Sequence, residues 1–186
     1  MGDVLMQSFI ANFYCSKDID IERFVKDKAI IFEKLGKART YFVVDVEASN
    51  SEVKILGFFS LAISILDVPK ELSNRSRKIL DGLSAKKYGE IVNKIPSILI
   101  GQFGKNDLYC RELSGEELFE LCLNKIYEGQ KIFGGRIIMV ECKPVPKLID
   151  FYKREGFVLT SNEVNDGNFM MLHRVLQEEE IVLRDD

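Results

Sequence analysis

The chain has 186 residues, which suits a single globular domain, and its composition of 46% hydrophobic and 30% charged residues excludes a disordered protein. Its formal net charge of −3 speaks against a protein that coats nucleic acid, because such binding depends on Lys and Arg neutralising phosphates. The longest apolar run, residues 55–66, is shorter than the roughly 20 residues of a membrane-spanning helix, so no membrane partner is expected. The acidic start Met1-Gly2-Asp3 does not resemble a secretory signal, and the cytoplasm is the expected compartment.

The cysteines and the histidine bear on metal sites and thiol chemistry. No Cys-x-x-Cys pair occurs, and four free thiols are expected at Cys15, Cys110, Cys122 and Cys142. The single histidine, His173, lies in an apolar and basic stretch typical of a strand. We therefore expect no metal centre, and a strand position for His173 is favoured over a role in a Cys-His pair.

In the first third of the chain the pattern predicts a strand, a helix and two further strands. Residues 8–14 are rich in Phe, Ile and Tyr, as an edge strand would be. From Asp18 to Gly36 apolar residues recur at three- and four-residue steps, which predicts an amphipathic helix, with a break within it left open. Residues 40–46 and 54–66 are rich in β-branched and aromatic residues, and the polar run between them predicts an antiparallel pair.

The middle of the chain contains a basic segment, a strand and a long helix. Residues 70–94 are polar and basic, and we interpret them as a mobile, partly helical excursion. Residues 97–104 are apolar and flanked by glycine, which predicts a central strand buried on both faces. A helix then begins at Ser114 and ends near Gly134-Gly135. Its apolar stripe is predicted at Leu118, Leu121, Cys122, Ile126 and the stem of Lys125.

The last third of the chain predicts three strands and a short helix. Residues 136–141 form another buried strand, and Pro144 and Pro146 then open a helix that Gly156 caps. The last two strands and the turn that joins them are expected at 157–159, 169–175 and 165–168.

The start of the helix at Ser114-Gly115 is a candidate anion site. A strand that leads through a loop into a helix leaves backbone N–H groups of the first helical turn unpaired, at the positive end of the helix dipole. A pyrophosphate group fits such a cradle. The alternative needs no ligand, because Ser114 and Glu117 match the Ser-x-x-Glu capping box, in which side chains satisfy two of those donors.

Tyr152 is the second candidate. It lies within residues 150–157, where an aromatic pair near the end of a short helix precedes a glycine and a strand. Tyrosine hydroxyls, whose ordinary pKa is about 10, can donate a proton to a departing thiolate. The alternative is that Phe151 and Tyr152 pack in the core and that Gly156 only caps the helix.

Taken in chain order, these elements resemble the GCN5-related N-acetyltransferases (the GNAT family) over nearly the whole chain. The most specific motifs are residues 98–102 (Ile-Leu-Ile-Gly-Gln), the helix start at Gly115 and residues 148–157, which contain Phe-Tyr-x-x-x-Gly-Phe. The resemblance implies an α/β (α+β) fold with a mixed central sheet of about six or seven strands flanked by helices. It also implies a single domain over residues 1–176, followed by an acidic tail over residues 177–186.

The resemblance further implies acetyl-coenzyme A as co-substrate and a direct transfer to a primary amine. The central strand would offer backbone groups to pantetheine, the amides before the helix would hold the pyrophosphate, and the thioester would lie between strands 97–104 and 136–141. These contacts are expected at Gln102, Phe103, Gly104, Arg111, Leu113, Ser114 and Gly115. Tyr152 matches the position whose residue protonates the coenzyme A thiolate once the amine has attacked the acetyl carbonyl.

The pyrophosphate loop departs from the family pattern of Gln or Arg, two residues, Gly, one residue, and Gly or Ala. This chain has Cys-Arg-Glu-Leu-Ser-Gly over residues 110–115 and keeps only the final glycine. Leu113 stands where a glycine is usual, and Glu112, Glu116 and Glu117 add negative charge beside the expected anion. An alternative function is therefore a binding or regulatory module that keeps the fold but binds acetyl-coenzyme A weakly or not at all.

A finer resemblance is to the acetyltransferase toxins of toxin-antitoxin pairs. It rests on residues 38–44 after the first helix, the long insertion before Ile98, and Phe151-Tyr152. It implies aminoacyl-tRNA as the acceptor and an antitoxin protein as a partner. The alternative acceptor is a small-molecule or protein amine, and the formation of a homodimer is left open. The Lys and Arg residues of 70–94 are interpreted either as tRNA contacts or as a solvated cover over the acceptor cleft.

Overall fold

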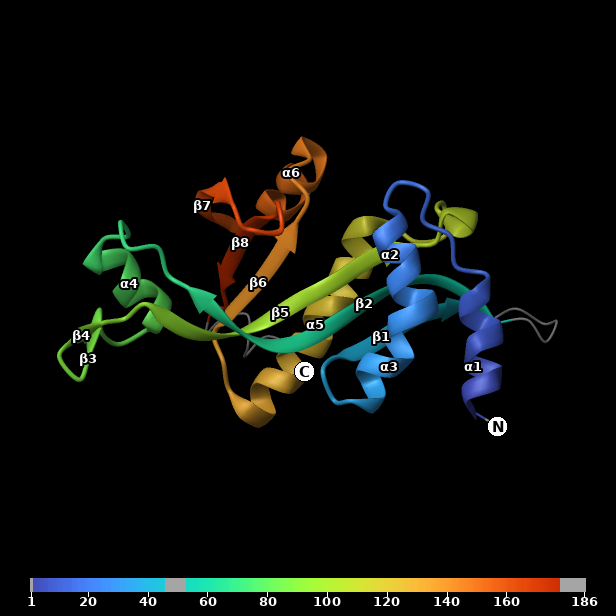
Figure 1. The fold of residues 1–186 in the computed structure, drawn as a ribbon, viewed down its shortest axis with the longest axis horizontal. Helices are drawn as coiled ribbons and strands as arrows, with labels where there is room; N and C mark the ends of the chain where they lie inside the picture. The colour runs from blue at the N-terminus through green and yellow to red at the C-terminus, as the bar shows by residue number, and fades with distance from the viewer. Residues whose placement is uncertain (1, 46–52, 178–186) are drawn as a thin grey trace. The chain divides into compact units, whose positions relative to one another are not determined.

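The computed structural model describes residues 2–45 and 53–177, whose helices and strands are labelled in Figure 1. The main sheet has six strands in the order β1-β2-β5-β6-β8-β7, and β3 pairs with β4 in a separate two-stranded sheet. Parallel and antiparallel neighbours both occur, so the predicted mixed sheet flanked by helices is confirmed. The polar run at 48–51 and the acidic tail from residue 178 lie outside the described residues.

The chain forms two compact units. The first comprises Met1–Ala62 and Gly101–Ile126, and the second comprises Ile63–Ile100 and Tyr127–Asp186. Three elements contribute residues to both units: β2 (Lys54–Asp67), β5 (Lys94–Lys105) and α5 (Gly115–Phe133). Within residues 2–45 and 53–177, no helix combines the length and the apolar character that a membrane crossing requires.

The first unit begins with a helix, α1 (Gly2–Ala11), so the strand predicted at residues 8–14 is wrong. Phe9 and Ile10 precede Phe13 by four and three residues, which are helical spacings. The turn after the helix is closed by the Phe13 N–H, which donates to the Ile10 carbonyl over 3.1 Å. Ile10 and Phe13 are buried in the core of this unit, and Phe9 packs against that core. Within the seven residues 8–14, the helical spacing of these apolar residues cannot be distinguished from the alternation of a strand.

The helix predicted from Asp18 to Gly36 is confirmed as one continuous run with a π-helical turn in its middle. The segments of the run are α2 (Ile19–Arg23), η1 (Phe24–Lys28) and α3 (Ala29–Lys34). The carboxylate of Asp18 caps the start by accepting from the Asp20 N–H, and Gly36 follows the end with φ +64°. The run buries Phe24, Val25 and Ala29 in the core of the first unit.

The predicted antiparallel pair is β1 (Arg39–Asp45) with β2. Tyr41 lies opposite Phe59, and their rings stack with centroids 5.2 Å apart. The register shifts between Val43 and Val44, which is the signature of a β-bulge.

The helix predicted from Ser114 is α5, and its stripe is confirmed in part. Leu118, Cys122 and Ile126 are buried, whereas Leu121 is exposed. The ammonium of Lys125 lies over the Tyr41 ring, 5.9 Å from its centroid, which agrees with a stem packed along the apolar face. The helix stops where predicted, at Gly134 and Gly135, which both have positive φ.

In the second unit, β5 pairs in parallel with β6 (Ile137–Cys142), from Ile98 opposite Ile138 to Ile100 opposite Val140. β8 (Met170–Val175) is antiparallel both to β6 and to β7 (Val158–Val164). In the chain, α6 (Pro146–Arg154) follows β6 and precedes β7, and Gly156, with φ +82°, comes after the helix. The predicted turn at 165–168 is confirmed by the Asn168 N–H, which donates to the Asn165 carbonyl over 2.8 Å.

Residues 70–94, here called the basic insertion, contain α4 (Asn74–Asp81) and the hairpin of β3 (Lys86–Lys87) and β4 (Glu90–Ile91), all shown in green in Figure 1. The helical part of the prediction is confirmed. Arg77 differs from the other basic residues, because it is buried and its guanidinium donates to four backbone carbonyls within 3.1 Å. These carbonyls belong to Pro69, Lys70, Leu72 and Val92. Arg77 therefore holds the insertion together and is not a solvated phosphate contact.

Candidate functional site

The segment that joins β5 to α5, residues 106–114, contains the predicted pyrophosphate site and is called here the β5–α5 loop. It includes a short 3₁₀ helix, η2 (Asp107–Tyr109). The ammonium of Lys105, the last residue of β5, donates to the carbonyl oxygens of Cys110, over 3.0 Å, and of Leu113. One cation thus joins the middle and the end of the loop and places a positive charge against its backbone.

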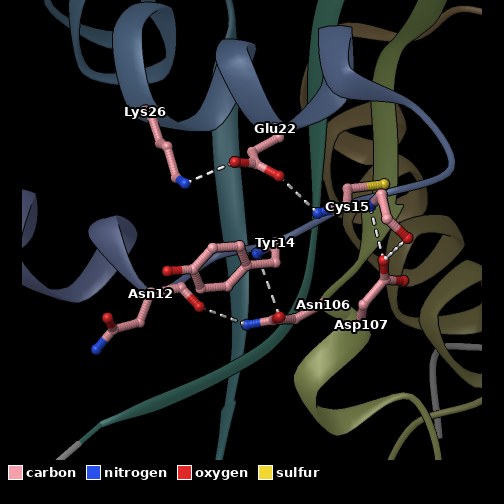
Figure 2. Close-up of polar contacts among 8 residues, drawn as sticks. Asn12, Tyr14, Cys15, Glu22, Lys26, Asn106 and Asp107 are labelled. Carbon is pink, nitrogen blue, oxygen red and sulfur yellow. Dashed lines mark hydrogen bonds and ion pairs between the residues drawn. The ribbon is translucent and has the colours of Figure 1, made fainter.

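Asn106 fixes the start of the loop to two other segments of the first unit, as Figure 2 shows for the N-terminal one. Its side-chain oxygen accepts from the N–H groups of Tyr14 (3.3 Å) and Leu108 (3.1 Å). Its side-chain nitrogen donates to the carbonyls of Asn12 (3.1 Å) and Ile55 (2.9 Å). Asn106 is 1% exposed and all four hydrogen-bonding positions of its side chain are used, so the site strongly favours asparagine.

Asp107 adds a second link to the same N-terminal segment. Its N–H donates to the Tyr14 carbonyl, and its carboxylate accepts from the hydroxyl (2.6 Å) and the N–H (2.7 Å) of Ser16. The Ser16 hydroxyl is the main reason that the pKa of Asp107 lies below its ordinary value. Glu22 extends the network, because its carboxylate accepts from the Cys15 N–H and from the Lys26 ammonium. The loop is therefore held in place by polar contacts that need no ligand.

Leu113, which replaces the usual glycine of the family pattern, is buried and turned toward the core of the first unit. A Cβ placed on Gly57 of β2 would lie 3.1 Å from Leu113 Cδ2 and 3.2 Å from the Gly104 carbonyl oxygen. Leu113 is also absent from the residues with positive φ, so its backbone conformation does not require glycine. The Leu113 side chain fills space beside Gly57.

The capping box of α5 is formed. The Ser114 N–H donates to the Glu117 carboxylate over 2.7 Å, and the Glu117 N–H donates to the Ser114 hydroxyl over 3.0 Å. Mainly because of the first bond, the pKa of Glu117 lies below its ordinary value. Two donors remain near the helix start: in the part of the chain that the structure describes, the N–H groups of Leu113 and Gly115 make no hydrogen bond. The ligand-free alternative thus accounts for some of the amides and leaves others available.

The other predicted cofactor contacts lie on β5 and in the loop. Phe103 packs edge-on against Phe119 of α5, with ring centroids 6.1 Å apart, and Gln102 is partly exposed beside it in the chain. Gly104 allows α2 to approach β5, because a Cβ there would lie 2.6 Å from Ile21 Cγ2. Arg111 is exposed. The structure thus brings Gln102, Phe103, Gly104, Arg111, Leu113, Ser114 and Gly115 into one unit, at the end of β5 and the start of α5.

Tyr152 lies in the second unit, on α6, and is 5% exposed. Its ring makes edge-on contacts with Phe151 and Phe157, at centroid distances of 5.2 and 5.5 Å. Its carbonyl accepts from the Phe157 N–H over 3.0 Å, which closes the chain after Gly156. The packing contacts of the alternative interpretation are therefore present, and they hold the ring in a defined position.

His173 is on β8, as predicted, and shares a 2.9 Å hydrogen bond between its Nδ1 and the Thr160 hydroxyl. Burial lowers the pKa of His173, so the ring is neutral at pH 7. All four cysteines are free thiols, as predicted. Burial raises the pKa of Cys122 and raises that of Cys142 to about 11, which keeps both protonated and poorly nucleophilic.

Two residues that shape the loop, Lys105 and Asn106, were not predicted. The sequence Gly104-Lys105-Asn106-Asp107 has the composition of an exposed turn. Lys105 bonds to backbone carbonyls of the loop, and Asn106 bonds to backbone groups of Asn12 and Tyr14. A local sequence pattern does not reveal such backbone partners. The only local signal is the position of Asn106 before the 3₁₀ helix, where its side chain caps the Leu108 N–H.

No protein-family model matches the sequence, and no curated protein is similar to it in sequence. Solved structures are similar in fold. A structure of AtaT complexed with acetyl-methionyl-tRNAfMet has 18% identity and a TM-score of 0.71, with 94% of this chain and 91% of that chain covered. A tyrosine-to-phenylalanine mutant of KacT has 19% identity and a TM-score of 0.69, with 94% and 90% covered. A structure of AtaTR bound with AcCoA has 19% identity and a TM-score of 0.67, with 94% and 89% covered. The chain therefore has the GNAT fold of these toxins, as the resemblance in its sequence predicted.

Proposed function

We propose that the chain is an N-acetyltransferase that transfers the acetyl group of acetyl-coenzyme A to a primary amine. The observation that carries the proposal is the start of α5, where the N–H groups of Leu113 and Gly115 donate to no other described residue. These donors lie at the positive end of a 19-residue helix, on a loop whose shape Lys105 and Asn106 maintain. The GNAT fold supports the same assignment. We also propose that residues 1–176 form one domain.

The β5–α5 loop fits a diphosphate in part. The amides of Leu113 and Gly115 would donate to its oxygens, Arg111 would add a charge-assisted contact, and Lys105 lies beneath the loop. The backbone of Gln102 to Gly104 would hold the pantetheine arm. Glu112, Glu116 and Glu117 oppose the ligand by charge, and the Glu117 carboxylate already occupies the Ser114 N–H. We therefore infer a weaker cofactor affinity than a glycine-rich loop would provide.

Acetyl-coenzyme A would supply the acetyl group and a thiolate leaving group. The attacking amine forms the new N–C bond while the C–S bond breaks, and the proton lost by the amine balances the one that the sulfur gains. We propose that Tyr152 Oη donates the proton to the sulfur, because Phe151 and Phe157 fix its ring. One structural neighbour is a tyrosine-to-phenylalanine mutant of KacT, and another is such a mutant of AtaT. The choice of a tyrosine in both proteins agrees with a tyrosine as the proposed proton donor.

The acceptor that best agrees with the structural neighbours is an aminoacyl-tRNA, since AtaT was solved with acetyl-methionyl-tRNAfMet. A small-molecule or protein amine is the other class of acceptor. An antitoxin partner is proposed on the same basis, because AtaT was solved with the C-terminus of the antitoxin AtaR.

The test is release of free thiol from acetyl-coenzyme A in the presence of an amine panel that includes aminoacyl-tRNA. The proposal predicts acceptor-dependent release that Tyr152→Phe slows at saturating substrate, with little change in cofactor affinity. Tyr14→Phe is the matched control, because Tyr14 is exposed and contacts the β5–α5 loop through its backbone N–H and carbonyl. Equal turnover by Tyr152→Phe and wild type would remove Tyr152 from the mechanism.

A second function is favoured by the closed capping box and the three glutamates at the helix start. A module that kept the GNAT fold without transfer would show neither thiol release nor acetylation with any acceptor. Turnover above background that is abolished by changing the β5–α5 loop would exclude this alternative.

A further inference from the structure

The turn of the β3–β4 hairpin holds a tyrosine in an unfavourable backbone conformation. Lys86 pairs with Ile91 and Lys87 with Glu90, which leaves Tyr88-Gly89 as a two-residue turn. Both turn residues have positive φ, +54° for Tyr88 and +85° for Gly89, as in a type I′ turn. Asn-Gly is the sequence that this turn prefers, and a residue with a large side chain is disfavoured there.

No contact within residues 2–45 and 53–177 accounts for a tyrosine at this position. Tyr88 is 99% exposed, and among the described residues it has no aromatic, cation–π or hydrogen-bonding partner. Its backbone strain is therefore not offset by packing. A strained and fully exposed aromatic side chain is typical of a residue retained for binding.

The surroundings of Tyr88 are strongly basic in an acidic chain. The basic insertion has seven Lys and Arg residues against three acidic residues, a net charge of +4, whereas the whole chain carries −3. The Arg77 guanidinium bonds to backbone carbonyls of the insertion, and the Lys94 ammonium lies 3.5 Å from the Asp67 carboxylate. Five other cations are exposed and make no ion pair with a described residue. These are Lys70, Arg75, Lys78, Lys86 and Lys87. Arg136 extends the cationic surface, because its guanidinium lies against Gly82 at the end of α4.

We propose that the basic insertion is an RNA-binding surface on which Tyr88 stacks against an unpaired base while Lys86 and Lys87 contact backbone phosphates. The charge complements any polyanion, including an acidic protein. The exposed ring at the turn favours RNA, because an unstacked base offers a planar partner and alternates with phosphates along the strand. Leu83, 81% exposed and close in the chain, adds apolar surface next to the cations.

This inference deepens the proposed function by naming the surface that would hold the RNA of an aminoacyl-tRNA acceptor, and in that respect rests on it. The binding test contains no acetyl-coenzyme A, so RNA binding and acetyl transfer can fail separately. Fluorescence anisotropy of the full chain would use a labelled ten-nucleotide unstructured RNA, with a blunt RNA duplex and polyglutamate of matched charge as competitors.

The variants separate recognition from stability. Tyr88→Phe keeps a stacking face and should bind as wild type, whereas Tyr88→Ala should weaken binding by about 5- to 150-fold. Tyr88→Asn places the preferred residue at the turn, so it should raise Tm while losing affinity like Tyr88→Ala. Lys86→Gln with Lys87→Gln should reduce the salt dependence of log Kd by about 1.4, and Lys28→Gln with Lys34→Gln, outside the insertion, should not.

Three results would overturn the proposal. The first is an absence of RNA binding by wild type at low salt. The second is wild-type affinity in Tyr88→Asn, which would remove the ring from recognition. The third is competition by polyglutamate with the same dependence on Tyr88, which would identify an acidic protein surface as the partner. Tighter binding of the single strand than of the duplex, with loss in Tyr88→Asn despite a raised Tm, would support it.

Discussion

The side-chain oxygen of Asn106 accepts a hydrogen bond from the N–H of Tyr14, 92 positions away in the chain, over 3.3 Å. The link ties the start of the β5–α5 loop to the segment after α1. Because the Asn106 amide also bonds to Ile55, three segments of the first unit depend on one buried side chain.

Asn106→Ala should therefore lower the free energy of unfolding by about 2–4 kcal/mol, because it leaves buried backbone groups without partners. Chemical denaturation would measure the loss. Asn12→Ala is the matched control, since Asn12 contributes only its backbone carbonyl to this network and should retain most of the stability. Similar losses in both variants would show that the side-chain amide of Asn106 is not the element that holds the loop.

Leu113→Gly would restore the glycine of the family pattern, and we expect it to harm the protein. The buried leucine side chain packs beside Gly57, so its removal should reduce the free energy of unfolding by about 3–5 kcal/mol and should not tighten cofactor binding. Thermal denaturation and a cofactor titration on the same sample would check both parts. A gain in affinity without a loss of stability would show that Leu113 obstructs the site.

Glu117 predicts a pH dependence. Its pKa is lower in the folded chain than its ordinary value, chiefly through the Ser114 N–H, so the unfolded state binds the proton more readily. The contribution to stability is therefore present above about pH 4.5 and is lost as the pH falls through the folded pKa. Thermal denaturation between pH 3 and pH 6 should show a smaller acid loss in Glu117→Gln than in wild type or in the exposed control Glu163→Gln.

His173 gives a second pH step at a different range. Burial lowers its pKa, so the unfolded state binds a proton that the folded state resists. Stability should be full above about pH 6.5 and should fall as the pH drops below that value toward the folded pKa. His173→Gln should lack this step when Tm is followed between pH 5 and pH 8. An unchanged profile would mean that the folded ring accepts the proton as easily as the unfolded one.

The sequence predicted those elements whose signals are local. The strand at 97–104 and the helix from Ser114 to Gly134 are defined by continuous apolar residues, by a capping box and by terminal glycines, and the structure confirms them. The N-terminal helix was not predicted, because the apolar residues within 8–14 fit the alternation of a strand as well as the spacing of a helix. Arg77 and Asn106 were missed as buried groups because their partners are backbone carbonyls brought together only by the fold.

Binding of acetyl-coenzyme A at the start of α5 is the claim on which the proposed function depends. Calorimetric titration of wild type, Gly115→Ala and Gly115→Pro tests it directly, because proline at the first helical position deletes the N–H and is compatible with the helix. The account predicts saturable binding to wild type and Gly115→Ala, and much weaker binding to Gly115→Pro at unchanged Tm. No detectable binding to wild type at millimolar acetyl-coenzyme A, or equal affinity in all three proteins, would contradict it.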